Sequence, residues 1–285
     1  MWIADKWKDY ELLDCSGGER LERWGKYILI RPDPQVIWKT ERERAEWRRA
    51  DGVYTRSERG GGSWSGKLPE SWEIGYGPLR FGVHPMGFKH TGLFPEQAVN
   101  WDRMAELIRE RRKNVSVLNL FAYTGGATAA CAAAGASVCH VDASRGMTEQ
   151  AKENLRLSGL VDAPVRYIVD DCRKFVMREI RRGHRYDGIV MDPPSYGRGP
   201  SGEVWHLEDS IHELIALTAT LLSDTPLFFL VNSYTTGLSP LSMEYILRAE
   251  IKKNRGGRLE SGELALPVTE TGGALPCGAS AWWLP

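Results

Sequence analysis

The sequence has no excess of charge of either sign, because 37 Lys and Arg residues balance 37 Asp and Glu residues among its 285 positions. This balance excludes a histone-like protein that is basic over its whole surface, while local basic patches stay possible. Cysteine is scarce, and none of the five cysteines belongs to a CxxC pair. We therefore expect free thiols in a reducing compartment, with no disulfide framework and no structural zinc site. They are Cys15, Cys131, Cys139, Cys172 and Cys277.

Long hydrophobic runs are also missing. The most apolar stretch, residues 214–231, is interrupted by Asp224 and Pro226, so it is too broken to span a membrane. Residues 1–14 carry charges throughout and lack the apolar segment of a secretory signal. The six histidines show no spacing typical of metal ligands. We expect a cytoplasmic protein that holds no metal and does not contact a membrane.

The first eighty residues differ in texture from the rest. Short strand-like runs, such as 26–32 and 71–77, alternate with turns rich in Gly, Pro and Ser. The charged stretch 40–50 predicts a helix, and the Gly-rich segment 59–66 predicts a mobile loop. These patterns predict a small β-rich module over residues 1–80 and a second domain over residues 81–285.

Strand and helix patterns alternate in the second domain. This alternation is typical of right-handed βαβ units, so it predicts an open, doubly wound, mostly parallel sheet with its ligand at the carboxyl ends of the strands. A closing antiparallel pair is expected at 257–268 and 280–285. The other predicted strands are 115–123, 137–144, 165–172, 186–194 and 226–234, and the predicted helices are 127–135, 147–159, 173–183, 206–223 and 241–255.

Acidic residues follow three consecutive strands of this predicted sheet. Asp142 ends the second strand, Asp170 and Asp171 end the third, and Asp192 ends the fourth. The first strand instead ends in a small-residue turn, 119–126, where Gly125 lets a ligand approach the backbone. An acid after the second strand commonly binds the ribose of a nucleotide-like cofactor. The pattern predicts one functional cleft.

The fourth strand continues into DPPSY, residues 192–196. Pro193 and Pro194 remove two N–H donors, so neighbouring carbonyls can point into the cleft without backbone partners. Such acceptors suit an exocyclic amine or an imino group of a base. Tyr196 offers an aromatic face on which a flipped base could stack.

Taken together, these motifs resemble the class I S-adenosylmethionine-dependent methyltransferases, and in particular the bacterial 23S rRNA cytosine-5 methyltransferases. The resemblance covers roughly 81–236 and includes KHTGLFPEQ at 89–97. It implies a seven-stranded Rossmann-like sheet, S-adenosyl-L-methionine as cofactor, an RNA substrate, and a substrate-recognition role for the N-terminal module. The implied catalytic residues are Asp192, Pro193, Pro194 and Tyr196. The implied cofactor-binding residues are Thr91, Gly92, Phe94, Gln97, Asn119, Phe121, Tyr123, Thr124, Gly125, Gly126, Asp142, Ala143, Ser144, Asn154, Asp171 and Cys172.

The sequence departs from that family where its catalytic cysteine would stand. Residues 232–236 read NSYTT, without a thiol, and Cys277 is a remote substitute. Tyr196 also falls one place later than the aromatic residue of the amino-methylating tetrapeptide. The methylated atom and the oligomeric state therefore stay open.

Other functions stay open as well. A protein or a small molecule could be the acceptor, and a cofactor-binding RNA module without transfer activity is a further alternative. An NAD-dependent oxidoreductase is disfavoured because no GxGxxG follows a strand. Three basic clusters could contact phosphates or could be solvated helix ends. They are Arg109, Arg111, Arg112 and Lys113; Arg178, Arg181, Arg182 and Arg185; and Lys252, Lys253, Arg255 and Arg258.

Overall fold

The computed structural model describes residues 1–57, 61–111, 114–198, 204–234 and 238–285. Its central feature is an eight-stranded sheet in the order β1-β16-β17-β15-β12-β9-β10-β11. The neighbours β15, β12, β9, β10 and β11 all pair in parallel. The predicted doubly wound, mostly parallel sheet is confirmed. Its strands are β1 (Trp2–Ile3), β9 (Ser116–Leu120), β10 (Ser137–Asp142), β11 (Val165–Val169), β12 (Gly188–Met191), β15 (Phe228–Ser233), β16 (Arg258–Pro267) and β17 (Ala274–Leu284).

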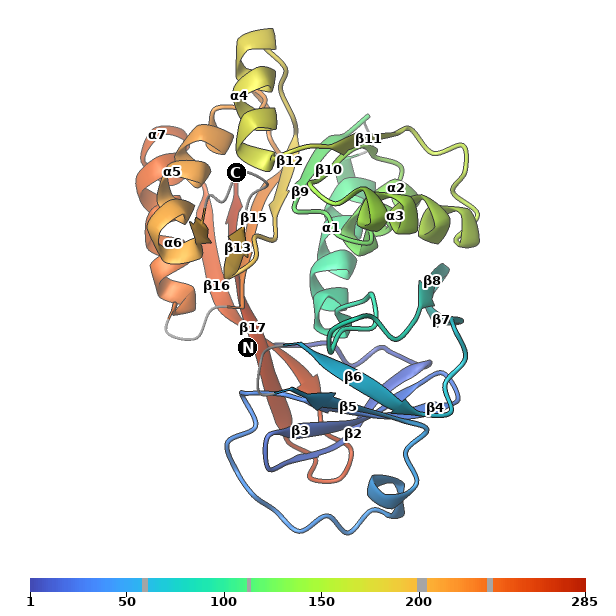
Figure 1. Ribbon diagram of the computed structural model, residues 1–285. Helices are drawn as coiled ribbons and strands as arrows, with labels where there is room; N and C mark the ends of the chain where they lie inside the picture. The colour runs from blue at the N-terminus through green and yellow to red at the C-terminus, as the bar shows by residue number, and fades with distance from the viewer. Residues whose placement is uncertain (58–60, 112–113, 199–203, 235–237) are drawn as a thin grey trace.

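Helices cover both faces of this sheet (Figure 1). Along β9, Val117 packs into the core beneath α1–α3, while its neighbour Leu118 packs into the core beneath α4–α6. The two cores explain why the parallel strands are apolar on both faces. The helices are α1 (Ala98–Arg111), α2 (Gly126–Ala133), α3 (Arg145–Leu157), α4 (Cys172–Arg182), α5 (Leu207–Ala219) and α6 (Pro240–Leu247), which a π-turn at Arg248–Lys252 joins to α7 (Lys253–Arg255).

The N-terminal strands form the second lobe, drawn in blue in Figure 1. A five-stranded sheet in the order β2-β3-β4-β5-β6 is followed by the hairpin β7-β8. This agrees with the predicted β-rich character of the segment. The strands are β2 (Tyr10–Ser16), β3 (Glu19–Trp24), β4 (Tyr27–Pro32), β5 (Gly52–Arg56), β6 (Gly62–Gly66), β7 (Trp72–Tyr76) and β8 (Leu79–Val83).

The lobes share strands at both ends of the chain. β1 pairs in parallel with β16, which adds an eighth strand to the seven predicted. Beyond β16, the backbone N–H of Thr269 donates to the Leu12 carbonyl at 3.0 Å. β17 therefore runs from one lobe to the other, as Figure 1 shows. The division at residue 80 stays a prediction about folding units.

Two local predictions in the N-terminal lobe are wrong. The stretch 40–50 contains only a 3-10 turn at Ala45–Arg48, because it lacks the apolar face of an amphipathic helix. The one buried side chain of this turn is that of Trp47, whose Nε1 donates to Asp14. The predicted loop is a strand over Gly62–Gly66, where a Cβ on Gly62 would lie 2.3 Å from the Thr55 carbonyl oxygen. Residues 59 and 60 of that segment lie outside the described residues.

A short hairpin follows the fourth predicted strand. It pairs β13 (Tyr196–Arg198) with β14 (Val204–His206), and the sequence analysis did not predict it. Within the described ranges, no helix is long and apolar enough to cross a membrane.

Candidate active site

The loop after β9 has a strained backbone. Phe121 has a φ of 56° and Tyr123 a φ of 49°, both in the left-handed backbone region that residues other than glycine rarely adopt. Asp142 at the end of β10 fixes this loop, because its Oδ2 accepts from the Tyr123 N–H at 2.8 Å. Its Oδ1 accepts from the Ser144 N–H at 2.8 Å. Strain held by such contacts is typical of functional sites.

Asp142 is also electrostatically distinctive. Burial raises its pKa above the ordinary range, while its two backbone hydrogen bonds act in the opposite direction. The carboxylate sits at the strand end where the sequence predicted a ribose-binding acid. Ala143 and Ser144, which follow it, are exposed, and Ser144 caps α3.

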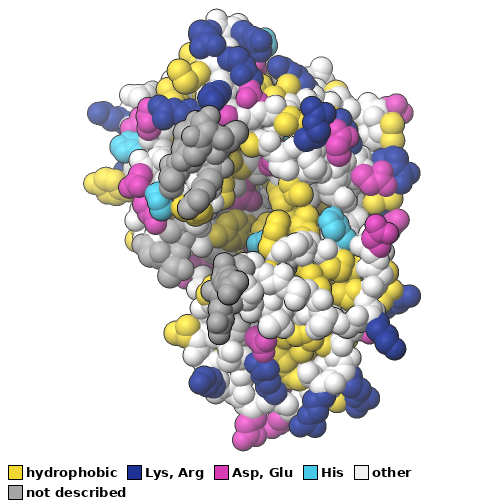
Figure 2. Space-filling view, viewed as in Figure 1, with side chains coloured by type: hydrophobic (Ala, Val, Ile, Leu, Met, Phe, Trp, Pro, Cys, Tyr) yellow, Lys and Arg dark blue, Asp and Glu magenta, His cyan; other side chains and the backbone are white. Residues whose placement is uncertain are grey.

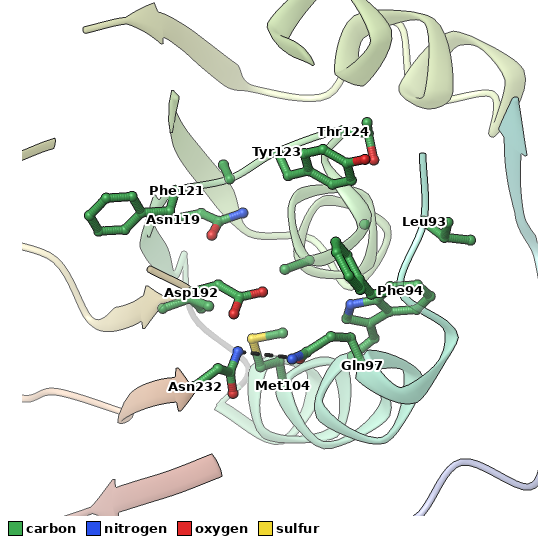
Figure 3. Close-up of a pocket in the computed structure, with 15 residues that line it drawn as sticks. Leu93, Phe94, Gln97, Met104, Asn119, Phe121, Tyr123, Thr124, Asp192 and Asn232 are labelled. Atoms are coloured by element: carbon green, nitrogen blue, oxygen red, sulfur yellow. Dashed lines mark hydrogen bonds between the residues drawn. The ribbon is translucent and has the colours of Figure 1, made fainter. Parts of the chain in front are cut away.

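A first cavity lies at the carboxyl ends of β9 and β12. Figure 3 shows Asp192, Phe94 and Tyr123 around it, with Asn232 and Gln97 joined at its lower edge. The predicted site residues that line it are Phe94, Gln97, Asn119, Phe121, Tyr123, Thr124, Gly126 and Asp192. The sequence analysis did not assign its other lining residues, Leu93, Trp101, Met104, Ala122, Ala127, Val190 and Asn232.

The KHTGLFPEQ stretch closes over the same loop. Thr124 donates from its hydroxyl to the Gly92 carbonyl at 2.5 Å, and Gly92 has φ 94°. The Phe94 ring lies 5.5 Å from the Tyr123 ring. Thr91 is buried, and its hydroxyl has no hydrogen-bond partner.

Several predicted cofactor residues support the loop without lining the cavity. Asn154 uses both ends of its amide, donating to the Thr124 carbonyl at 2.8 Å and accepting from the Gly82 N–H at 2.9 Å. Asp171 caps α4 by accepting from the Lys174 N–H, and the buried Cys172 accepts at Sγ from the Phe121 N–H at 3.3 Å. Gly125 packs against α3, where a Cβ would lie 2.8 Å from that of Ala151.

Asp192 ends β12 and faces the first cavity. Its Oδ1 is buried and has no hydrogen-bond partner. Burial and, after it, the nearby Glu96 raise the pKa of this carboxyl to about 7, although the hydrogen bond from the Asn232 amide acts in the opposite direction. A carboxyl group of that pKa can exchange a proton near neutral pH.

The rest of the DPPSY motif turns away from the first cavity. The Pro194 carbonyl accepts from the side-chain Nε1 of Trp205 at 2.7 Å, so its partner is a side chain and not the backbone. Pro193 is buried. Tyr196 is 50% exposed on β13, with its ring 5.3 Å from that of His206. Base stacking on Tyr196 stays a prediction.

A second cavity lies between the two lobes. Figure 2 shows a hollow between the lobes, with hydrophobic and His side chains around it. The N-terminal lobe contributes Arg20, Arg31, Pro32, Asp33, Pro34 and Gln35; the rest of the lining is Lys89, His90, Leu93, Phe94, Pro95, Glu96, Pro194, Ser195, Tyr234 and Cys277. The sequence analysis did not assign this cavity, because no local motif joins its residues.

A buried hydrogen-bond network underlies the first cavity. Asn100 donates to Gln97 at 2.8 Å and to Ser280 at 2.9 Å, and Ser280 donates to Asn232 at 2.6 Å. Gln97 in turn donates to the Tyr234 hydroxyl at 2.7 Å. The network joins α1, β15 and β17, and its members Gln97 and Asn232 line the first cavity together with Asp192.

No cysteine in the chain is prepared to act as a nucleophile. All five thiols are buried. Burial raises the pKa of each one above its ordinary value, which keeps it protonated. Ser233 and Tyr234 follow Asn232, while Thr235 and Thr236 lie outside the described residues.

The basic clusters are partly neutralised. Arg178 pairs with Asp170, and Arg182 lies 3.2 Å from Glu179. Arg255 donates to two backbone carbonyls at the end of the α5 region. Arg112 and Lys113 lie outside the described residues. Across the parts of the chain that the structure describes, no group of His, Cys, Asp and Glu could hold a metal ion.

A family model described as S-adenosylmethionine-dependent methyltransferase matches residues 53–242. The chain belongs to this family. The predicted class of enzyme and the predicted cofactor are confirmed.

Known proteins resemble this methyltransferase to different extents. Ribosomal RNA large subunit methyltransferase K/L of Shewanella frigidimarina is 33% identical over 146 residues, which is 50% of this chain and 20% of the relative. The chain thus spans about a fifth of the length of the curated relatives it matches. The crystal structure of the SAM-dependent methyltransferase from Agrobacterium tumefaciens is 36% identical, covers 100% of this chain and 93% of that one, and has a TM-score of 0.93. A methyltransferase from Streptococcus mutans, with a TM-score of 0.74 and 19% identity over 98% of this chain and 76% of that one, shares the fold.

The residues of the methyltransferase's first cavity fit the cofactor. The strained loop carries aromatic and small residues, the carboxylate of Asp142 stands at the next strand end, and Asp192 Oδ1 is an orphaned buried acceptor. These features suit a ligand with hydroxyl groups, an adenine ring and a cationic centre. S-adenosyl-L-methionine has all three.

Proposed function

We propose that this methyltransferase transfers a methyl group to a ring or exocyclic nitrogen of an RNA base, with ribosomal RNA as the acceptor. The RNA acceptor is supported by the curated relatives, which are named ribosomal RNA large subunit methyltransferases and match about half of this chain. A role of the N-terminal lobe in recognising the substrate is supported by the second cavity, because that lobe forms one of its walls.

The carboxyl group of Asp192 is the observation that supports nitrogen, and not carbon, as the methylated atom. Methylation at carbon 5 of cytosine needs a thiolate that adds to the ring, and every thiol of this chain is buried with a raised pKa. A nitrogen acceptor needs instead a hydrogen-bond acceptor for its N–H and a place for the proton it loses. Asp192 Oδ1 offers the first, and a pKa of about 7 offers the second.

We assign the chain's residues the following roles. Asp142 binds hydroxyl groups of the cofactor's ribose, and the loop of Phe121 and Tyr123 shapes the remainder of that site. S-adenosyl-L-methionine, when bound, supplies a methyl group already activated by its sulfonium. Asp192 orients the acceptor nitrogen and takes its proton, while Phe94 covers the site and excludes water.

The test is methyl transfer to purified large-subunit ribosomal RNA with labelled S-adenosyl-L-methionine, followed by digestion to nucleosides and mass spectrometry. A labelled N-methyl nucleoside supports the proposal, and a labelled 5-methylcytidine contradicts the choice of nitrogen. Label in protein or in small metabolites, with none in RNA, contradicts the RNA acceptor.

Asp192→Asn is the matched loss-of-function variant, because it keeps the side-chain shape. Asp170→Asn, after the edge strand β11, is the control that should stay active.

A further inference from the structure

We propose that the second cavity is the acceptor pocket of the methyltransferase and that Glu96 binds an N–H group of the base within it. This inference rests on the proposed function and names the residue that would hold the acceptor on the side of the N-terminal lobe.

The position of the cavity supports this role. It shares Leu93 and Phe94 with the first cavity, and it is lined by Pro194 and Ser195 of the methyl-transfer motif. A molecule in the second cavity therefore lies next to the cavity that Asp192 lines.

The charges contributed by the N-terminal lobe are already matched within it. Arg31 makes two hydrogen bonds to Glu22, at 2.6 and 2.8 Å, and Tyr10 donates to the same carboxylate at 2.8 Å. Arg20 pairs with Asp33. These paired groups form a preformed polar wall that leaves little net positive charge for an anionic ligand such as a phosphate.

Glu96 differs from these paired side chains of the N-terminal lobe. Its side chain is buried, with the residue 2% exposed, and its Oε2 has no hydrogen-bond partner. Burial raises the pKa of Glu96, although the guanidinium groups of Arg20 and Arg31 act in the opposite direction. A buried acceptor without a partner costs about 1–3 kcal/mol, so its presence beside a cavity points to a ligand that donates to it.

Glu96 and Gln97 are adjacent in the chain, but their side chains line different cavities. Both lie on the 3-10 turn Pro95–Gln97. Gln97 lines the first cavity, whereas Glu96 lines the second. Glu96 also acts on Asp192, whose pKa it raises, so the two carboxyl groups are electrostatic neighbours. Each has an orphaned oxygen, and both need N–H donors.

A heterocycle with amino or imino N–H groups can donate hydrogen bonds to both Glu96 and Asp192. A free phosphate or a carboxylate would place acceptor against acceptor and is disfavoured. The base would reach Asp192 with the nitrogen to be methylated, and it would reach Glu96 with a second donor.

The experiment is Glu96→Gln, with Glu106→Gln on the exposed face of α1 as the control. Methyl transfer to purified large-subunit ribosomal RNA is measured against RNA concentration, and the Kd for S-adenosyl-L-methionine is measured by calorimetry. For Glu96→Gln we expect kcat/KM for RNA to fall at least tenfold, mainly through KM. We expect the Kd for the cofactor to stay within twofold and the melting temperature to stay level or rise.

Three results overturn this inference. The first is a Glu96→Gln protein with the wild-type kcat/KM. The second is a loss of cofactor affinity in Glu96→Gln that accounts for its loss of activity. If Glu96→Gln does not fold, Glu96→Asp is used instead, because it retracts the carboxylate by one methylene, and the third result is a wild-type kcat/KM in that variant. A wild-type protein that methylates no RNA overturns the proposed function itself, and this inference with it.

Discussion

The two cavities of this methyltransferase are built in different ways. The first is lined by residues that follow successive strands of one sheet, together with the segment just before α1, and aromatic, aliphatic and neutral amide side chains predominate. The second draws on β3, β4, the Lys89–Glu96 region, the DPPSY motif and β17, and it contains three basic and two acidic side chains. The comparison teaches that the proposed cofactor site is encoded locally in the sequence, whereas the proposed acceptor site forms only once the two lobes pack together.

The largest expected effect tests where the two cavities join. Asp192→Asn should lower kcat for methyl transfer by about 10²–10⁴-fold, because it removes a general base. The cofactor Kd should stay within twofold. In the wild type, kcat/KM should rise with pH up to about 7 and then level off, since only the ionised carboxylate accepts a proton and its pKa is about 7.

Burial, Glu96 and the Asn232 amide set the pKa of Asp192. Glu96→Gln should therefore move the inflection of the pH profile to lower pH. An Asp192→Asn enzyme with wild-type turnover, or a profile flat between pH 5 and 9, would remove this residue from proton transfer.

The next effect tests the cofactor side alone. Asp142→Ala should weaken binding of S-adenosyl-L-methionine by at least 10-fold, because it removes a charged acceptor worth about 1.5–3 kcal/mol and releases the N–H of Tyr123. Calorimetry measures the Kd, and far-ultraviolet circular dichroism checks that the sheet is intact. Asp170→Ala, at the next strand end, is the control. Equal Kd values for Asp142→Ala and the wild type would contradict the proposed role.

A third change tests the floor beneath the first cavity. Asn100→Leu preserves volume but removes the donor shared by Gln97 and Ser280, so we expect a loss of about 1–3 kcal/mol in the free energy of unfolding. Urea denaturation measures it. The same variant should lower kcat more than it raises the KM for RNA, because Asn232 and Gln97 lose their fixed positions. A change in KM alone would argue that the network belongs to the acceptor pocket.

The smallest effect is expected at the edge of the cofactor site. Asp171 is exposed and already accepts from the Lys174 N–H, so Asp171→Asn should weaken cofactor binding by only a few-fold and leave α4 capped. Competition with S-adenosylhomocysteine measures this small change. A loss larger than that of Asp142→Ala would reverse the proposed ranking of the two acids.

Much of the first cavity could be predicted from the sequence because its parts are short and contiguous. Asp142 and Asp192 could be placed since the strands before them are apolar, end abruptly and lie in parallel, which brings their carboxyl ends to one edge. Local patterns also indicated the loop from Asn119 to Gly126. These patterns could not distinguish residues that line the cavity from residues that support it. Phe121 lines the cavity, whereas the amide of Asn154 forms hydrogen bonds with two backbone groups.

The second cavity could not be predicted for a physical reason. Arg20 and Arg31 stand on neighbouring antiparallel strands, and Cys277 stands near the other end of the chain. Only long-range pairing brings them together. Glu96 was within reach, since it precedes Gln97 in the KHTGLFPEQ motif, but its lack of a partner becomes visible only when its surroundings are known.

The long hairpin of β16 and β17 sets how an acceptor can enter. It pairs with β15 in the catalytic sheet, with β1 at its outer edge, and through its tip with the backbone of Leu12 and Leu13. Because this hairpin is hydrogen-bonded to both lobes, we expect it to resist hinge opening and to keep the width of the gap between the lobes nearly constant. Entry then depends on the acceptor changing shape instead of the protein. A nucleotide already outside its helix should be captured faster than one that must first unpair, which makes the local secondary structure of the acceptor a determinant of rate.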